Sequence, residues 1–202
     1  MKQGNVQSVS AVSTEKKRVA WGVTGSGDKL AETVKVMRKL RDEYEDSVVI
    51  WVYLSKAGEH VAKLYLLMDD LRESFPRVFV EVSANVPFLA GDLQLGKFEF
   101  LLVAPATSNT VAKIASGIGD SLLSNSAIMA LKGCGKVYMM PTDIREGTVT
   151  TRLHDGRETR IRVRREDAEN VGRLRAMEGV TVLEKPEQIR GVFRKRFGGK
   201  GI

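Results

Sequence analysis

The most constraining feature of the sequence is a short apolar run at residues 98–104, which Pro105 ends abruptly. A run of this length without polar alternation is typical of a strand that is buried on both faces of a parallel sheet. Small and hydroxyl-bearing residues follow at 106–110, just before a helical pattern that we expect to begin near Val111. Backbone N–H groups and a helix start converge at this end of such a strand, so the segment predicts a ligand site.

A second small, polar cluster lies at residues 116–121 and precedes another helical run. Two such turns therefore follow one strand within about twenty residues, which is the usual placement of ligand-binding loops beyond the carboxyl end of a strand. We interpret the whole stretch, residues 98–125, as a segment that surrounds a flat polar ligand.

Further buried strands are predicted at residues 19–23, 47–54, 78–82 and 136–140, because each is a short apolar run bounded by turn residues. Amphipathic helical patterns separate them, at about 30–44 and 59–74, and residues 83–96 form an expected loop of unusual length. Strands that alternate with helices predict a single α/β domain over residues 1–202, with a doubly wound parallel sheet.

The turn at residues 24–28 (TGSGD) does not meet either common glycine motif for nucleotides. The dinucleotide fingerprint requires a third glycine where this chain has Leu30, and the phosphate loop requires Lys and Ser/Thr directly after Gly27. The turn still predicts an anion site made of hydroxyls and helix N–H groups, with Asp28 as the helix cap. The open alternative is that the glycines serve only a tight turn. Ser55, after the second strand, is an expected phosphate contact.

The C-terminal part, residues 145–202, is predicted to extend the domain with a hairpin and helices. Residues 148–153 and 158–163 alternate with the period of antiparallel strands around an Asp155-Gly156 turn. A helix at 166–177, a strand at 180–183 and a helix at 186–197 should follow. Residues 1–16 read as a loose N-terminal arm.

Cysteine and histidine are too few for several chemistries. The single Cys134 cannot form an intramolecular disulfide or supply an iron–sulfur cluster, and two histidines make a histidine-rich metal site unlikely on composition. We expect Cys134 to be a loop residue, His60 a surface or cap residue and His154 an exposed turn residue. The sequence therefore predicts no catalytic side chain and no metal site, and any redox chemistry requires an organic cofactor.

The net charge of +7 is concentrated in the last quarter of the chain. Residues 151–202 hold 14 Lys/Arg against 8 Asp/Glu, whereas residues 1–150 hold 18 against 17. Such a patch can attract an acidic partner or be a solvated helix and tail. Nucleic acid is not an expected partner, since the basic helices have no interleaved aromatic residues beyond Phe193 and Phe197. No apolar run has the length of a membrane span, so a cytoplasmic protein without membrane contact is expected.

Three segments together resemble one known family. They are VAWGVTGSG at 19–27, LSKAGEHV at 54–61 and APATSNTVAKIASGIGDSLLSN at 104–125. These segments are similar to the flavin-binding segments of the homo-oligomeric flavin-containing cysteine decarboxylases, whose Pro-Ala-Ser-Ala-Asn-Thr motif here reads Pro-Ala-Thr-Ser-Asn-Thr at 105–110. The resemblance implies a Rossmann-like, flavodoxin-like sheet, bound FMN and more than one subunit. The FMN-binding residues that follow from it and from the turns are Thr24, Gly25, Ser26, Gly27, Ser55, Ala57, Pro105, Ala106, Thr107, Asn109, Thr110, Asp120, Ser121 and Leu122.

The sequence departs from the decarboxylases at two functional motifs. No histidine occurs at residues 85–96, where those enzymes carry their catalytic histidine, and their Pro-x-Met-Asn-x-x-Met-Trp motif is absent after Pro141. With its tail included, the chain most resembles the archaeal flavoproteins, which include archaeoflavoprotein and dihydromethanopterin reductase. That resemblance implies an electron-transfer protein reduced by ferredoxin, an acidic donor, with a downstream redox acceptor. The alternative is a flavin-dependent decarboxylase or flavin prenyltransferase that uses the same FMN site.

Overall fold

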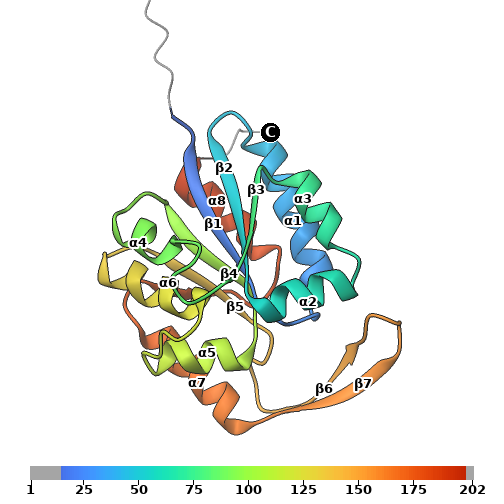
Figure 1. Cartoon of the computed structure of the whole chain (residues 1–202). Coiled ribbons are helices and arrows are strands. Elements are labelled where there is room, and N and C mark those ends of the chain that lie inside the picture. The colour runs from blue at the N-terminus through green and yellow to red at the C-terminus, as the bar shows by residue number, and fades with distance from the viewer. Residues whose placement is uncertain (1–14, 199–202) are drawn as a thin grey trace, which may run out of the picture.

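The computed structural model describes residues 15–198, so nearly all of the expected N-terminal arm lies outside the described residues. Six parallel strands form one sheet in the order β3-β2-β1-β4-β5-β8 (Figure 1). Their bounds are β1 (Lys17–Val23), β2 (Val48–Leu54), β3 (Arg77–Val80), β4 (Phe100–Ala106), β5 (Val137–Pro141) and β8 (Val180–Val182). This is the strand order of a doubly wound α/β sheet, which confirms the predicted fold class.

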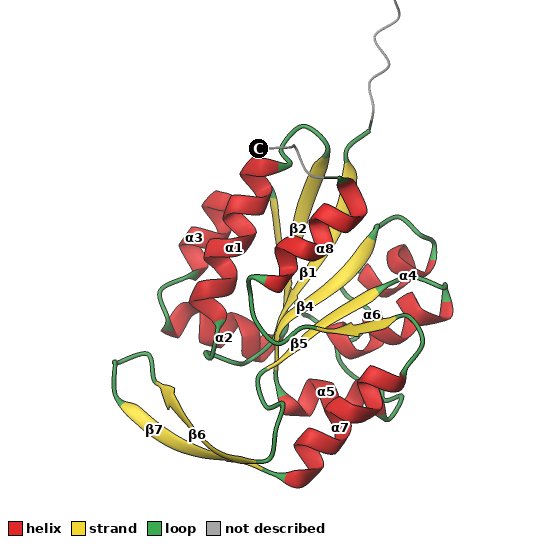
Figure 2. Ribbon diagram, turned by 180° about the vertical axis from the view of Figure 1, so that it is seen from behind, coloured by secondary structure: helices red, strands yellow, loops and turns green. Residues whose placement is uncertain are grey.

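Helices cover both faces of the sheet (Figure 2). One face carries α1 (Leu30–Glu43), α3 (Met68–Ser74) and α8 (Gln188–Phe197); the other carries α4 (Leu89–Gln94), α5 (Ser108–Ala115), α6 (Leu122–Lys132) and α7 (Arg165–Ala176). The remaining helix, α2 (Lys56–Leu64), follows β2. Because both faces are covered, the central strands are apolar apart from Lys17 and Arg18 at the start of β1, and β4 is buried at every residue.

Aromatic residues fill the core between the sheet and α8. Trp21 is fully buried, donates its indole N–H to the Ala104 carbonyl at 2.7 Å and meets Phe75 edge-to-face. Phe100 and Phe193 also pack edge-to-face, with centroids 5.6 Å apart. Burial of each such ring contributes on the order of 2 kcal/mol. The Trp21 hydrogen bond joins β1 to β4, the two strands whose ends position the candidate site, and Phe193 packs α8 onto β4.

The strand order reverses between β1 and β4, which pair in the middle of the sheet. β1 leads to β2 on one side, and β4 leads to β5 on the other, so the loops after β1 and β4 diverge to opposite faces. In parallel sheets such a switch point opens a crevice beyond the carboxyl ends of the strands. The predicted ligand segments therefore meet at one place, although they are about 80 residues apart in the chain.

Three local predictions were wrong. The single helix expected at 59–74 is two helices, separated at Leu66, whose φ is 56°. The expected loop at 83–96 contains α4, which packs on α6 through buried Leu89 and Leu93. Asp28 does not cap α1, because Lys29 occupies the cap position with φ 60° and no side-chain cap bond. In the first two cases packing of buried residues outweighed the local sequence preference.

The predicted hairpin is present and lies apart from the main sheet. β6 (Gly147–Arg152) and β7 (Glu158–Val163) pair only with each other and project from the body of the molecule (Figure 1). The Tyr65 hydroxyl donates to the Arg152 carbonyl at 3.3 Å and so ties the hairpin to the end of α2. After the hairpin the chain returns to the core, because β8 joins the sheet beside β5. None of the helices within residues 15–198 combines the length and apolarity needed to cross a bilayer.

Candidate functional site

A pocket of about 390 Å³ lies beyond the carboxyl ends of β1, β2 and β4. Its walls come from the turns after these strands, from the residue that follows β3 and from the starts of α2, α5 and α6. The lining residues are Thr24, Gly25, Ser55, Lys56, Ala57, Glu81, Thr107, Asn109, Thr110, Lys113 and Ser121. Most of them carry hydroxyl, amide or ammonium groups, so the pocket suits a polar, anionic ligand.

Thr24 connects the two turns at the switch point. Its buried hydroxyl donates to the Pro105 carbonyl at 2.8 Å and accepts the Thr107 backbone N–H at 2.9 Å. A side chain that both donates and accepts across the switch point holds the β1 and β4 turns at one separation. The hydroxyl of Thr24 is thereby satisfied by the protein, and its role in the pocket is structural.

The helices α2 and α5 both begin at the pocket with a capping hydroxyl. Ser55 Oγ accepts the Gly58 N–H at 2.9 Å, and Thr107 Oγ1 accepts the Thr110 N–H at 3.4 Å. These caps explain why α2 and α5 start a few residues earlier than periodicity suggested. The starts of both helices place partial positive charge at the pocket. The Ser55 hydroxyl donates to no acceptor among residues 15–198, so its proton is available to a ligand.

Two lysines add their positive charge to the partial positive charge at the starts of α2 and α5. Lys113 lies about one turn after Asn109 on α5 and forms an ion pair of 2.9 Å with Asp120. The Lys113 hydrogen bond lowers the pKa of Asp120, which is exposed. Lys56 follows the capping Ser55 directly and forms no ion pair among residues 15–198.

On the other side of the β1 turn, burial raises the pKa of Asp28, and the charges of Glu32 and Asp143 raise it further.

Eight of the fourteen predicted cofactor residues line this pocket, and six do not. The eight are Thr24, Gly25, Ser55, Ala57, Thr107, Asn109, Thr110 and Ser121. Pro105 and Ala106 belong to buried β4, and Leu122 is a buried residue of α6. Asp120 is turned to Lys113, and Ser26 and Gly27 lie in the β1 turn outside the lining.

Sequence reasoning missed Lys56, Glu81 and Lys113. Signals for two of them were present, since Lys56 is the first residue after a predicted phosphate contact and Lys113 lies four residues after Asn109, on the same helical face. Glu81 had a weaker signal, as a charged residue at the end of an otherwise apolar strand. Glu81 reaches the pocket because β3 pairs with β2, and that pairing is not a local feature of the sequence.

The histidines and the cysteine lie away from the pocket. His60 is exposed on α2, and His154 is exposed in the hairpin turn, where its ring meets Tyr65 at 6.1 Å between centroids. Cys134 is exposed between two glycines, with φ 58°. These positions agree with the predicted roles, and none of the three side chains can transfer a proton to a ligand in the pocket.

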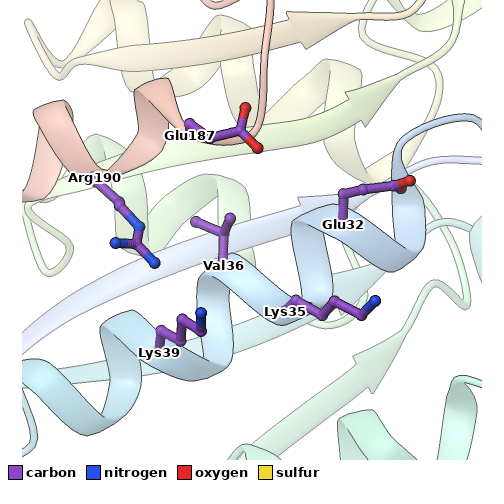
Figure 3. Close-up of a pocket in the computed structure, with 6 residues that line it drawn as sticks. All are labelled: Glu32, Lys35, Val36, Lys39, Glu187 and Arg190. Carbon is purple, nitrogen blue, oxygen red and sulfur yellow. The ribbon is translucent and has the colours of Figure 1, made fainter.

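Another hollow, of about 430 Å³, lies between α1 and α8 (Figure 3). Lys39 on α1 and Arg190 on α8 point toward each other beside the apolar Val36, whereas Lys35 extends along α1 away from α8. The carboxylates of Glu32 and Glu187 also border the hollow. It is slightly larger than the first pocket but is bordered by long side chains of α1 and α8 and by Glu187 at the start of α8, and none of its lining residues belongs to a strand end of the sheet. We therefore assign the ligand site to the first pocket and regard this groove as a protein surface.

Comparison with known proteins finds a family model, sequence relatives and solved structures that are similar to this chain. A family model described as Flavoprotein matches residues 7–194. An uncharacterized protein of Methanocaldococcus jannaschii is 49% identical over 180 residues, covering 89% of this chain and 96% of the relative. The dihydromethanopterin reductase (acceptor) of the same organism is 30% identical, with the same coverage. The crystal structure of Burkholderia xenovorans DmrB with FMN, described as a cubic protein cage for redox transfer, superposes with a TM-score of 0.75 at 34% identity, over 90% of this chain and 95% of that one.

Proposed function

The chain belongs to the flavoprotein family, and we propose that it binds FMN in the pocket beyond β1, β2 and β4 and acts as an electron carrier. The observation that carries the proposal is the composition of that pocket. Hydroxyls, helix starts and two lysines converge in a volume of about 390 Å³, at the switch point where doubly wound sheets bind nucleotides.

The residues present fit a ring and phosphate ligand. Ser55 and Lys56 at the start of α2 offer an O–H donor and an ammonium group to a phosphate. Asn109 offers an amide without any other partner in residues 15–198, which suits the polar edge of a flavin ring. Gly25 lets the turn after β1 pack closely on the start of α2, because a Cβ there would lie 2.6 Å from the Ala57 Cβ.

The side chains of the pocket bind and orient rather than react. Neither histidine lines it, and the lining contains no cysteine, so among the described residues it provides no imidazole or thiol group; its ionisable side chains are Lys56, Glu81 and Lys113. Bound FMN supplies the centre that takes up and releases electrons. The decarboxylase and prenyltransferase alternative remains a prediction from sequence, and no contact in the structure favours it.

We further propose ferredoxin as the electron donor. The donor's acidic surface would meet cations on α1 and α8, where Lys35, Lys39 and Arg190 border the groove of Figure 3. α8 carries three more cations in its last turn, at Arg194, Lys195 and Arg196. Opposite charges accelerate the encounter of two proteins, most strongly at low ionic strength. Both helices begin after the carboxyl ends of strands of the parallel sheet, α1 after β1 and α8 after β8.

The acceptor and the assembly are proposed by similarity to the relatives. Dihydromethanopterin reductase activity is the first activity to assay, and a homo-oligomer is the expected assembly because DmrB is described as a cage. Size-exclusion chromatography with light scattering measures the assembly. Oxidation of the reduced protein by dihydromethanopterin, followed at the flavin absorption bands, measures the acceptor.

Stopped-flow reduction tests the electron-carrier proposal. The holoprotein is mixed anaerobically with reduced ferredoxin in one experiment and with NADH in another. We expect rapid flavin bleaching with ferredoxin and slow or no bleaching with NADH. A protein that is reduced by the nicotinamide alone would refute ferredoxin as the donor, and a protein that binds no flavin would refute the proposal as a whole.

A further inference from the structure

Glu81 holds the starts of two helices at the mouth of the pocket. It follows β3 directly, and its own backbone N–H extends the sheet by donating to the Leu54 carbonyl at 2.9 Å. From that fixed backbone the side chain reaches both walls: Oε1 accepts the Leu122 N–H at 2.8 Å, and Oε2 accepts the Lys56 N–H at 3.2 Å. One carboxylate thus occupies the first N–H group of α6 and the first N–H group of α2.

Both oxygens of the Glu81 side chain accept N–H donors, and a carboxylate has acceptor capacity at each of its two oxygens. The positive ends of the two helices favour a negative charge at this position. The side chain is half-buried and lines the pocket, so its charge lies at the ligand site rather than in bulk solvent.

A second contact ties the same helix to the loop that follows Glu81. The Asn125 amide on α6 donates to the Ala84 carbonyl at 3.1 Å and to Asn85 Oδ1 at 2.9 Å. The loop after β3 and the start of α6 therefore form one wall of the pocket. Glu81 is the link in that wall that also reaches α2 on the opposite side.

We propose that Glu81 is a positioning residue that sets the separation of α2 and α6 around FMN, and that its negative charge lowers the reduction potential of the bound flavin. The inference rests on the proposed function, since it assumes FMN in this pocket. Reduction adds negative charge to a flavin at neutral pH, and a nearby carboxylate disfavours that added charge. A flavin tuned in this way is a stronger reductant for a downstream acceptor.

The test compares Glu81→Gln and Glu81→Asp with wild type. Glutamine has nearly the same shape, but it loses the charge and can accept only one of the two N–H groups. Aspartate keeps the charge but shortens the reach. Glu99→Gln is the matched control, because Glu99 precedes β4 at the opposite edge of the sheet and the substitution changes the net charge equally.

For each variant, FMN affinity is measured by fluorescence titration and the midpoint potential by spectroelectrochemistry. We expect Glu81→Gln to weaken FMN binding about tenfold and to shift the potential to more positive values, because a charge-assisted hydrogen bond is lost. Glu81→Asp should weaken binding but keep a potential near that of wild type, and Glu99→Gln should change neither. Glu81→Ala, measured in the same way, replaces Glu81→Gln if the latter does not fold.

Two results would overturn the inference. An unchanged potential in Glu81→Gln would show that the charge does not act on the flavin. Tighter FMN binding in that variant would show that the carboxylate occupies N–H groups that the cofactor needs. If wild-type protein binds no FMN, the proposed function itself fails, and that outcome is distinct from either of these.

Discussion

Gly25 and Ala57 approach so closely that a methyl group on Gly25 would lie 2.6 Å from the Ala57 Cβ. The first residue belongs to the turn after β1 and the second to the start of α2, so their close contact joins two walls of the pocket. The φ of Gly25 does not demand glycine here. The close approach of Ala57 is the reason for a residue without a side chain.

We therefore expect Gly25→Ala to weaken FMN binding about tenfold or more, because the added methyl group pushes the β1 turn away from α2. Fluorescence titration of the folded variant with FMN measures the loss. Gly172→Ala on α7 is the control, since nothing lies within 4 Å of its added Cβ. It should leave FMN binding unchanged and stabilise the helix by about 0.5–1 kcal/mol. Equal affinities for wild type and Gly25→Ala would mean that the cofactor does not lie at this turn.

Substitutions of Ser55 and of Asn109 should differ in their effect on stability although both weaken FMN binding. Ser55→Ala removes the cap of α2, so it should lower the free energy of unfolding by about 1 kcal/mol and also weaken FMN binding. Asn109→Ala removes an exposed amide without a partner in residues 15–198, so we expect it to weaken FMN binding about fivefold while changing stability by less than about 0.5 kcal/mol. Urea unfolding of the apoprotein and FMN titration give the two quantities. Full flavin retention in both variants would contradict the site.

Asp167 gives a pH-dependent contribution to stability. Its buried carboxylate accepts hydrogen bonds from the Arg164 guanidinium at 2.7 Å and from the Arg164 backbone N–H at 3.0 Å. The hydrogen bond from the guanidinium is the main cause of the lowered pKa of Asp167. A lowered folded-state pKa stabilises the protein above the unfolded pKa of about 4, and this contribution is lost as the pH falls through the folded value. Asp167→Asn should therefore cost about 1 kcal/mol at pH 7, and the difference from wild type should shrink below about pH 4. Urea unfolding at several pH values checks this, and a pH-independent difference would contradict it.

The groove between α1 and α8 should set the rate of reduction by an acidic donor. The double variant Lys35→Glu with Arg190→Glu reverses the charge of two groove residues. It should slow reduction by ferredoxin about tenfold at low salt and make the reduction rate less dependent on ionic strength. Reduction by dithionite should not change. Lys132→Glu with Lys136→Glu is the control, because it alters net charge equally on exposed residues outside the groove. If both double variants slow the donor to the same extent, net charge rather than the groove is responsible.

The central strands could be predicted from sequence because burial on both faces leaves a continuous apolar run, as in β4. The order of strands and helices predicted the fold class, and the strand order of the structure then shows the switch point that brings Thr24, Ser55 and Thr107 to one pocket. Those three residues are polar at strand ends, where the local sequence and the fold agree.

The remaining features depend on tertiary contacts. Leu66 breaks a helix that periodicity predicts as continuous, because the turn there buries Met68 and Leu71 against the core. Glu81 gains its role from α2 and α6, which lie 25 and 41 residues away in the chain. No local pattern contains such a contact, so the sequence could indicate a charged residue at a strand end but not what it joins.

The most direct test of the account is a spectral titration of the apoprotein with FMN and, in parallel, with riboflavin, which has the same ring but no phosphate. The helix starts, Ser55 and Lys56 are assigned to the phosphate, and Asn109 to the ring. The account therefore predicts saturable binding of FMN, with an affinity at least about tenfold higher than that for riboflavin. No perturbation of the flavin bands by FMN, or equal affinity for the two flavins, would contradict it.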